Sequence, residues 1–209
     1  MGDFLALDYP NNPFVIFGVP HLVALAIIAV IVFALIRVGP RMTADQRKWF
    51  RYGVGTWLII NELSWHWWNW ATGQWTVQTM LPLHLCSVLV WLCAYMLVTK
   101  NRTIYEFAYL IGIAGALQAV LTPDLGQYAF PHFRYFQVFL SHGLIIISAL
   151  YMTLVEGYRP TWSSVKRVAI YGNIYFLFGN YFTQVYAHEA NPLQQLLELL
   201  PSSFLLVQF

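Results

Sequence analysis

Residues 14–36 of the chain read FVIFGVPHLVALAIIAVIVFALI, a long apolar run without a single Asp, Glu, Lys or Arg. A helix that crosses a bilayer needs about 20 mostly apolar residues, so this run is long enough to span the membrane. The rest of the 209-residue chain is similar, because 59% of its residues are hydrophobic and only 10% are charged. Soluble chains carry about a quarter charged residues. The composition therefore excludes a water-soluble protein and predicts an integral membrane protein.

Five further apolar stretches follow the first one, and together they predict an all-α, polytopic membrane helix bundle with six complete spans. No soluble domain, linker or internal repeat interrupts them, so we expect residues 1–209 to form a single transmembrane domain. The C-terminal stretch 192–209 is too short to span convincingly and is interrupted by Pro201, which favours an interfacial segment or a partial seventh span. The six predicted spans are residues 14–36, 50–70, 82–98, 104–122, 133–155 and 165–187.

The basic residues predict the orientation of the bundle. Ten of the eleven lie in or beside alternate loops, and only Arg134 lies on the opposite side. Because Lys and Arg near the ends of spans stay in the cytoplasm, we expect the N-terminus to lie outside. The net charge of +2 gives no indication of nucleic-acid binding. The ten residues are Arg37, Arg41, Arg47, Lys48, Arg51, Lys100, Arg102, Arg159, Lys166 and Arg167.

Polar side chains within the predicted spans fall mostly in the outer half of the membrane. A single Asn, Gln or Ser at such a position usually joins two helices by a hydrogen bond. A carboxylate and several imidazoles at one level are costly to bury and instead favour a functional cavity that opens outward. The residues are Glu62, His66, Asn69, His84, Cys86, Gln118, Gln137, Ser141, His142, Asn173, Asn180 and Gln184.

Cys86 and His142 are the candidate catalytic pair. A thiol beside an imidazole forms a thiolate that attacks acyl carbons. His84 points about 200° away from Cys86 on the same helix, so the base must come from another helix, and His142 is the candidate. Glu62, at a similar depth, is predicted to orient the second nitrogen of His142. Cys93 is interpreted as a small buried hydrophobe.

Several motifs resemble those of the bacterial YwaF-like integral membrane proteins, which are akin to eukaryotic transmembrane protein 164. The resemblance covers about residues 50–182. It implies a multi-pass protein of the bacterial plasma membrane and a phospholipid acyltransferase with Cys86 and His142 at its active centre. The motifs are LPLHLC at 81–86, LTPDL at 121–125, FRYF at 133–136, SHG at 141–143 and VEGYRPTW at 155–162.

These observations together predict transacylation between membrane phospholipids. His142 takes the proton of Cys86, the thiolate attacks a phospholipid ester, and a second lipid hydroxyl receives the acyl group. The mechanism needs no cofactor and no metal, and its partners are the bilayer and its phospholipids. Residues expected to contact the substrate or the developing oxyanion are His66, His84, Gln118, Arg134 and Asn180.

Three other functions fit the same residues. A lipid hydrolase would use the same pair with water as the acceptor. A zinc hydrolase could coordinate the metal through Glu62, His66, His84 and His142, although no HExxH spacing is present. A proton-coupled transporter would use the buried carboxylate and imidazoles as a relay, but the polar groups lie on one side of the midplane and no repeat supports it. The acyl chain, the headgroup and the oligomeric state are not indicated.

Overall fold

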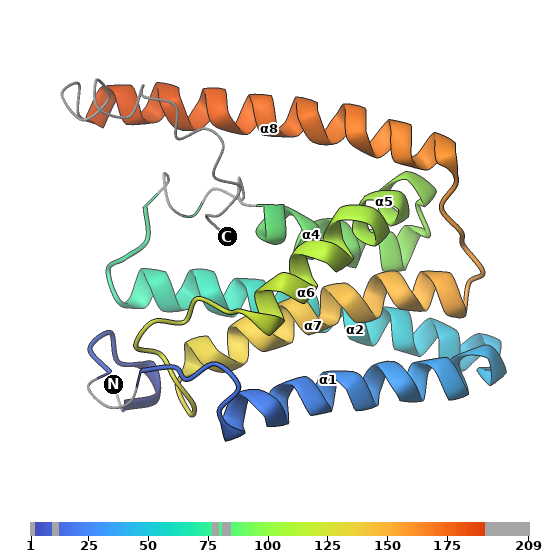
Figure 1. Ribbon diagram of the computed structural model, residues 1–209, viewed down its shortest axis with the longest axis horizontal. Coiled ribbons are helices and arrows are strands. Elements are labelled where there is room, and N and C mark those ends of the chain that lie inside the picture. The colour runs from blue at the N-terminus through green and yellow to red at the C-terminus, as the bar shows by residue number, and fades with distance from the viewer. Residues whose placement is uncertain (1–2, 10–12, 77–79, 81–84, 191–209) are drawn as a thin grey trace.

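The computed structural model describes residues 3–9, 13–76, 80 and 85–190, with only the backbone for 179–190. All of the regular structure in this part of the chain is helical, which confirms the all-α prediction (Figure 1). A π-helical turn, η3 (Ala108–Gly112), joins α5 and α6 into one continuous segment, Arg102–Leu121. The helices are α1 (Val19–Val38), α2 (Ala44–Ala71), α4 (Leu85–Thr99), α5 (Arg102–Phe107), α6 (Ile113–Leu121), α7 (Phe133–Leu154) and α8 (Trp162–Ala190), with short 3-10 turns η1 (Asp3–Leu5) and η2 (Gly39–Arg41).

Each of the six predicted spans overlaps a helix or, for residues 104–122, the continuous segment formed by α5, η3 and α6. By length and hydropathy, three helical segments in the described residues are sufficient to cross a membrane: Val19–Arg41, Arg102–Leu121 and Phe133–Leu154. Helix α4 is apolar but shorter. Residues 192–209, predicted to form an interfacial or partial span, lie outside the described residues.

Local side-chain caps explain where several helices begin. Thr43 and Gln46 form a reciprocal capping box at the start of α2, with bonds of 3.3 and 2.9 Å. Asn101 accepts the backbone N–H of Ile104 at 3.1 Å and begins α5. Such caps satisfy amide groups that have no partner inside the helix. The helices therefore start where the sequence supplies a polar cap, even if the apolar run starts later.

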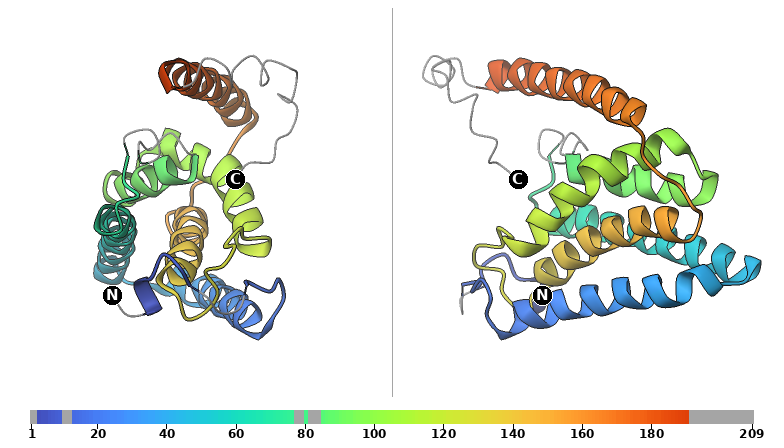
Figure 2. Two further views of the ribbon diagram at one scale, coloured as in Figure 1. Left: turned by 90° about the vertical axis from the view of Figure 1, so that its left-hand side faces the viewer. Right: turned by 45° about the vertical axis from the view of Figure 1, so that its right-hand side comes forward.

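Helix α7 is the centre of the bundle. It packs against α1, α2, α4 and α6, and Figure 2 shows it between α1, α2 and α6. In its most apolar stretch of 18 residues, 72% of the stretch is buried, compared with 11% of the corresponding stretch of α1. Helix α8 lies at the periphery and packs on α5 (Figure 1). Side chains on α7 therefore face protein on several sides, whereas most of α1 faces outward.

Consecutive long helices run in opposite directions, so the loops alternate between two ends of the bundle (Figure 1). At one end the basic loops meet: Lys100 donates to Glu156 at 2.7 Å, and Arg102 donates to the carbonyl of Arg159 at 3.3 Å. We call this the basic end. The prediction that the basic loops share one side agrees with these contacts.

The opposite end, which we call the amino-terminal end, contains residues 3–9. Three consecutive carbonyls of this segment accept hydrogen bonds from side chains elsewhere in the chain. Trp68 donates to Leu5 at 3.0 Å, and Nε2 of His132 lies 3.0 Å from the carbonyl of Ala6. Gln127 and Tyr128 both donate to the carbonyl of Leu7, at 2.8 and 3.2 Å. The N-terminal segment is thus tied to α2 and to the loop before α7.

His132 joins this segment to the start of α7. Its side chain is fully buried, and Nδ1 accepts the backbone N–H of Arg134 at 3.0 Å. Burial lowers the pKa of His132, and the nearby charge of Arg134 lowers it further, although the bond to Ala6 opposes the shift. Protonation would place a hydrogen on Nδ1 and remove the cap of α7.

We predict that His132 makes the fold sensitive to acid. An unfolded histidine has a pKa of about 6.5, so below this pH the unfolded chain binds a proton that the folded chain does not. Stability is therefore fully present above about pH 6.5 and is lost as the pH falls below it. Thermal unfolding in detergent between pH 7.5 and 5.5 measures this loss. His132→Asn, which keeps a good capping residue, is expected to show a shallower dependence; equal slopes would contradict the assignment.

Candidate functional site

Helices α2, α4 and α7 pack against one another, and this three-helix junction contains the main predicted site residues. Glu62 lies on α2, Cys86 on the first turn of α4 as described, and Arg134 and His142 on the first half of α7. These positions lie in the second half of α2 and in the first halves of α4 and α7, which are the halves away from the basic loops. The structure therefore brings side chains from three separate predicted spans to one region.

The imidazole of His142 has a defined tautomer. Its Nδ1 lies 2.8 Å from the carbonyl of Val138, one helical turn earlier, and 3.3 Å from Oγ of Ser141. A carbonyl oxygen only accepts hydrogen bonds, so Nδ1 carries the hydrogen and Nε2 of the neutral ring keeps its lone pair. Among the described residues Nε2 has no hydrogen-bond partner. His142 can therefore accept a proton at Nε2.

Glu62 does not bond Nδ1 of His142, where the sequence placed it, because Val138 occupies that nitrogen. The carboxyl group is instead buried, with 3% of the residue exposed, and Ser87 on α4 hydrogen-bonds it. Its Oε1 has no hydrogen-bond partner, and Nε2 of His66 lies 3.8 Å away. Glu62 is also close enough to act electrostatically on Cys86. It therefore belongs to the Cys86 side of the junction.

Both cysteines are free, as the sequence predicted, but their surroundings differ. Cys86 is half-buried, whereas Cys93 is completely buried among the core residues of α4. In the part of the chain that the structure describes, no hydrogen bond joins Cys86 to His142. Their helices pack directly on each other, and Glu62 is the charged neighbour of Cys86.

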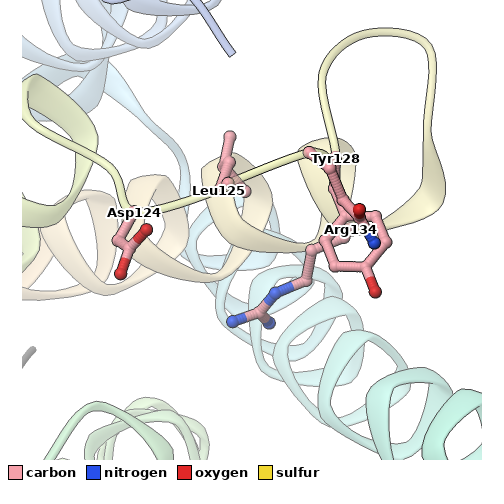
Figure 3. Close-up of a pocket in the computed structure, with 6 residues that line it drawn as sticks. Asp124, Leu125, Tyr128 and Arg134 are labelled. Atoms are coloured by element: carbon pink, nitrogen blue, oxygen red, sulfur yellow. The ribbon is translucent and has the colours of Figure 1, made fainter. Parts of the chain in front are cut away.

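Arg134 lies beside an open pocket of about 450 Å³ (Figure 3). Its guanidinium stacks over the ring of Trp65, 4.0 Å from the centroid, and Nη1 donates to the side chain of Gln137. None of the described carboxylates lies within ion-pair distance of it, so most of its N–H groups are available to an anion. The pocket is lined by Asp124, Leu125, Gly126, Gln127, Tyr128 and Arg134.

The remaining residues that were predicted to contact the substrate or the oxyanion differ in their surroundings. His66 joins the junction through Glu62, and its Nδ1 accepts from Trp75 at 3.3 Å. Gln118 is exposed on α6 and makes no side-chain hydrogen bond among the residues described. His84 and the side chain of Asn180 lie outside the described residues. Within the described ranges, no three His, Cys, Asp or Glu side chains are grouped as a metal site would require.

Sequence reasoning missed two neighbours of the site residues. Ser87 directly follows Cys86, and a hydroxyl beside a candidate nucleophile was a signal that it could contact the same partners. The carbonyl of Val138 gave no signal, because any helical residue has a carbonyl four positions earlier, and only the chosen rotamer decides its use.

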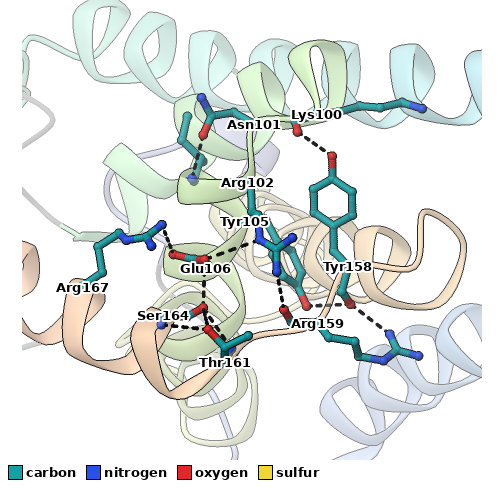
Figure 4. A network of polar contacts seen from close by, with 11 residues as sticks. Lys100, Asn101, Arg102, Tyr105, Glu106, Tyr158, Arg159, Thr161, Ser164 and Arg167 are labelled. Carbon is teal, nitrogen blue, oxygen red and sulfur yellow. Dashed lines mark hydrogen bonds and ion pairs between the residues drawn. The ribbon is translucent and has the colours of Figure 1, made fainter.

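A second polar cluster lies near the basic end and joins α5 to α8 (Figure 4). Glu106, only 2% exposed, accepts from Ser164 at 2.8 Å and from Arg167 at 3.0 Å. Arg102 lies 3.8 Å from the same carboxylate. Unlike Glu62, this buried carboxylate has hydrogen-bond partners on both oxygens, which is typical of a structural ion cluster.

A model of the TMEM164 family matches residues 16–193, which include every helix from α1 to α8 and all of the junction. The chain belongs to the TMEM164 family. This confirms the relationship to transmembrane protein 164 that the sequence motifs indicated, and the chain is accordingly a membrane protein. No curated protein and no solved structure gives a match. What this TMEM164 family member does must therefore be argued from its own residues.

We predict that Glu106 contributes strongly to the attachment of α8. In Glu106→Gln the charge that Arg167 contacts is lost, and because Arg167 is partly exposed we expect a cost of about 1–3 kcal/mol in the free energy of unfolding. Thermal unfolding in detergent measures the change. Arg102→Gln is the matched control, since its longer and exposed contact should cost less than about 1 kcal/mol. Equal losses in both variants would contradict the ranking.

Proposed function

We propose that this protein is a membrane-embedded phospholipid acyltransferase that transfers acyl chains through a thioester on Cys86. The observation that supports this most directly is the tautomer of His142, whose Nε2 is left as a free acceptor at the junction that also contains Cys86. A thiol and an unprotonated imidazole nitrogen are the two groups that nucleophilic acyl transfer requires. The sequence motifs that identified the family contain both residues.

The first half of the reaction forms the thioester. Nε2 of His142 removes the proton from Sγ of Cys86, and the thiolate attacks the carbonyl carbon of a phospholipid ester. The tetrahedral intermediate collapses with cleavage of the ester C–O bond. The leaving glycerol oxygen takes the proton from His142, so a lysophospholipid departs and the acyl chain stays on sulfur.

The second half reverses these steps with another lipid. The hydroxyl of the acceptor lipid gives its proton to His142 as its oxygen attacks the thioester carbonyl. The C–S bond breaks, a new ester forms, and the sulfur recovers the proton from His142. One base therefore serves both halves, and no cofactor or metal takes part.

Arg134 supports a phospholipid as the substrate. Arg134 lines a pocket together with Asp124 (Figure 3), but no carboxylate among the described residues lies within ion-pair distance of its guanidinium. Trp65 and Gln137 fix the position of the guanidinium. A guanidinium held in this way suits a phosphate diester, which offers acceptor oxygens and one negative charge. Since the ester groups of a phospholipid lie just below its phosphate, we assign Arg134 to the headgroup and Cys86 to the ester.

We also propose that all six helical segments cross the plasma membrane of a bacterial cell, with the N-terminus outside. The gathering of the basic loops at one end supports this orientation, because such loops stay in the cytoplasm. Arg134, near the other end, then lies at the level of the outer headgroups. In this orientation the reaction uses lipids of the outer leaflet.

The thioester gives a direct test of the function. Purified protein incubated with phospholipid should gain the mass of an acyl chain, and hydroxylamine should remove it. Cys86→Ala should show no adduct, whereas Cys93→Ser should retain it, because Cys93 is completely buried in the core, two helical turns farther along α4. An adduct that persists in Cys86→Ala would exclude Cys86 as the nucleophile.

A second prediction concerns Arg134. Arg134→Gln should raise the phospholipid concentration at half-maximal adduct formation by about tenfold or more, as expected for the loss of a charge-assisted contact. The maximal rate should change less, because the guanidinium does not contact the reacting carbonyl in this assignment. Arg47→Gln, at the basic end, is the control and should leave both values unchanged. A reduced maximal rate at unchanged half-saturation would contradict the headgroup role.

A further inference from the structure

Glu62 has an unusual environment for a carboxyl group. Only 3% of the residue is exposed, and within the described part of the chain its Oε1 has no hydrogen-bond partner. Buried carboxylates elsewhere in this protein are fully bonded, as Glu106 shows with Ser164 and Arg167. A charged oxygen without a partner at this depth carries a large desolvation cost. The arrangement therefore favours a carboxyl group that is not charged.

The groups that face Glu62 come from three helices. On α2, Nε2 of His66 lies 3.8 Å from Oε1, too far for a hydrogen bond. On α4, Ser87 bonds the carboxyl group and Cys86 lies within electrostatic range. On α7, Arg134 acts on Glu62 electrostatically but makes no ion pair within 4.0 Å in the described part of the chain. These contacts provide no full compensation for a negative charge on Oε1.

The proposed reaction adds a second constraint, because Cys86 must become anionic. Two adjacent negative charges in a low-dielectric site repel each other, so a charged Glu62 would oppose the thiolate. A protonated Glu62 has the opposite effect. It carries one O–H group, and the oxygen that lacks a partner in the resting site is free to donate it.

We propose that Glu62 is a neutral hydrogen-bond donor, which directs an O–H from Oε1 toward the negative charge that develops on Cys86 and on the tetrahedral intermediate. This inference rests on the proposed acyl transfer and assigns the donor that its oxyanion requires. Glu62 then acts on the reacting atoms, while His142 moves the proton. The neutral acid is preorganised, because its surroundings are packed protein and need no solvent rearrangement during the reaction.

The two variants Glu62→Gln and Glu62→Leu separate this role from that of an anionic residue. A glutamine is neutral and can still donate through its amide, so its rate of thioester formation should stay within about tenfold of the wild type. A leucine has no donor, and we expect a loss of about 10²–10³-fold, the usual effect of removing one oxyanion donor. Equal losses in the two variants would overturn the proposal. Ser148→Ala is the control, since Ser148 is a buried polar residue of α7 that bonds only Leu144 and should retain the wild-type rate.

A measurement without lipid tests the same assignment if the leucine variant does not fold. In a Cys93→Ser background, alkylation of Cys86 by iodoacetamide at pH 7 reports its thiolate fraction. If Glu62 is neutral, the alkylation rate with Glu62→Gln should stay within about threefold of the rate with Glu62. If Glu62 is an anion, its replacement should accelerate alkylation about tenfold or more. If Glu62 accepts the proton of Cys86, its replacement should slow alkylation similarly. Either change overturns the proposal. If the wild type forms no thioester while the two alkylation rates agree, the acyltransferase function fails but the neutral Glu62 stands.

Discussion

Polar groups inside a membrane helix bundle must find their hydrogen-bond partners within the protein, because the bilayer core offers no water. This constraint separates the buried polar residues into two groups. Glu106 has a partner on each carboxylate oxygen, and His132 uses both ring nitrogens. In contrast, Oε1 of Glu62 has no hydrogen bond, and Nε2 of His142 has none among the described residues. The first group joins segments of the fold, whereas the second supplies the two unbonded atoms that the proposed reaction uses.

The helices could be predicted from apolar runs, but their ends and their places in the bundle could not. Helix α2 begins at Ala44, before the predicted 50, because the Thr43 cap starts a helix whose first turns are charged and give no hydropathy signal. Helix α1 begins at Val19, after the predicted 14, because Pro20 fits only the first turn of a helix. Both runs are apolar enough to cross a bilayer, but the more apolar α1, with a mean hydropathy of 2.9 against 1.6 for α7, is the one that faces outward.

Depth along the spans predicts a group of Glu62, Cys86 and His142, because rise per residue places side chains at a level without knowledge of the packing. The structure places these residues on three helices that pack against one another, with Glu62 near Cys86. Depth could not identify the hydrogen-bond partner of Nδ1 of His142. A histidine at this depth could bond either the carboxyl group of Glu62 or, as the structure shows, the backbone carbonyl of Val138. Gln118 was predicted to lie at the same level, but its side chain is exposed on α6, and depth does not show which face of a helix meets its neighbours.

The two ends of the bundle hold their charged groups in different ways. Ion pairs around Glu106 and Glu156 connect α5, α7 and α8 at the basic end, where the pairs can be close and fully bonded. Near the amino-terminal end Arg134 is fixed by Trp65 and Gln137, not by a carboxylate. A carboxylate at that position would already neutralise the guanidinium and would compete with a phosphate. An aromatic face orients the same cation without adding a formal charge. Among the described carboxylates, Glu62 and Asp124 therefore act on Arg134 only from beyond ion-pair distance.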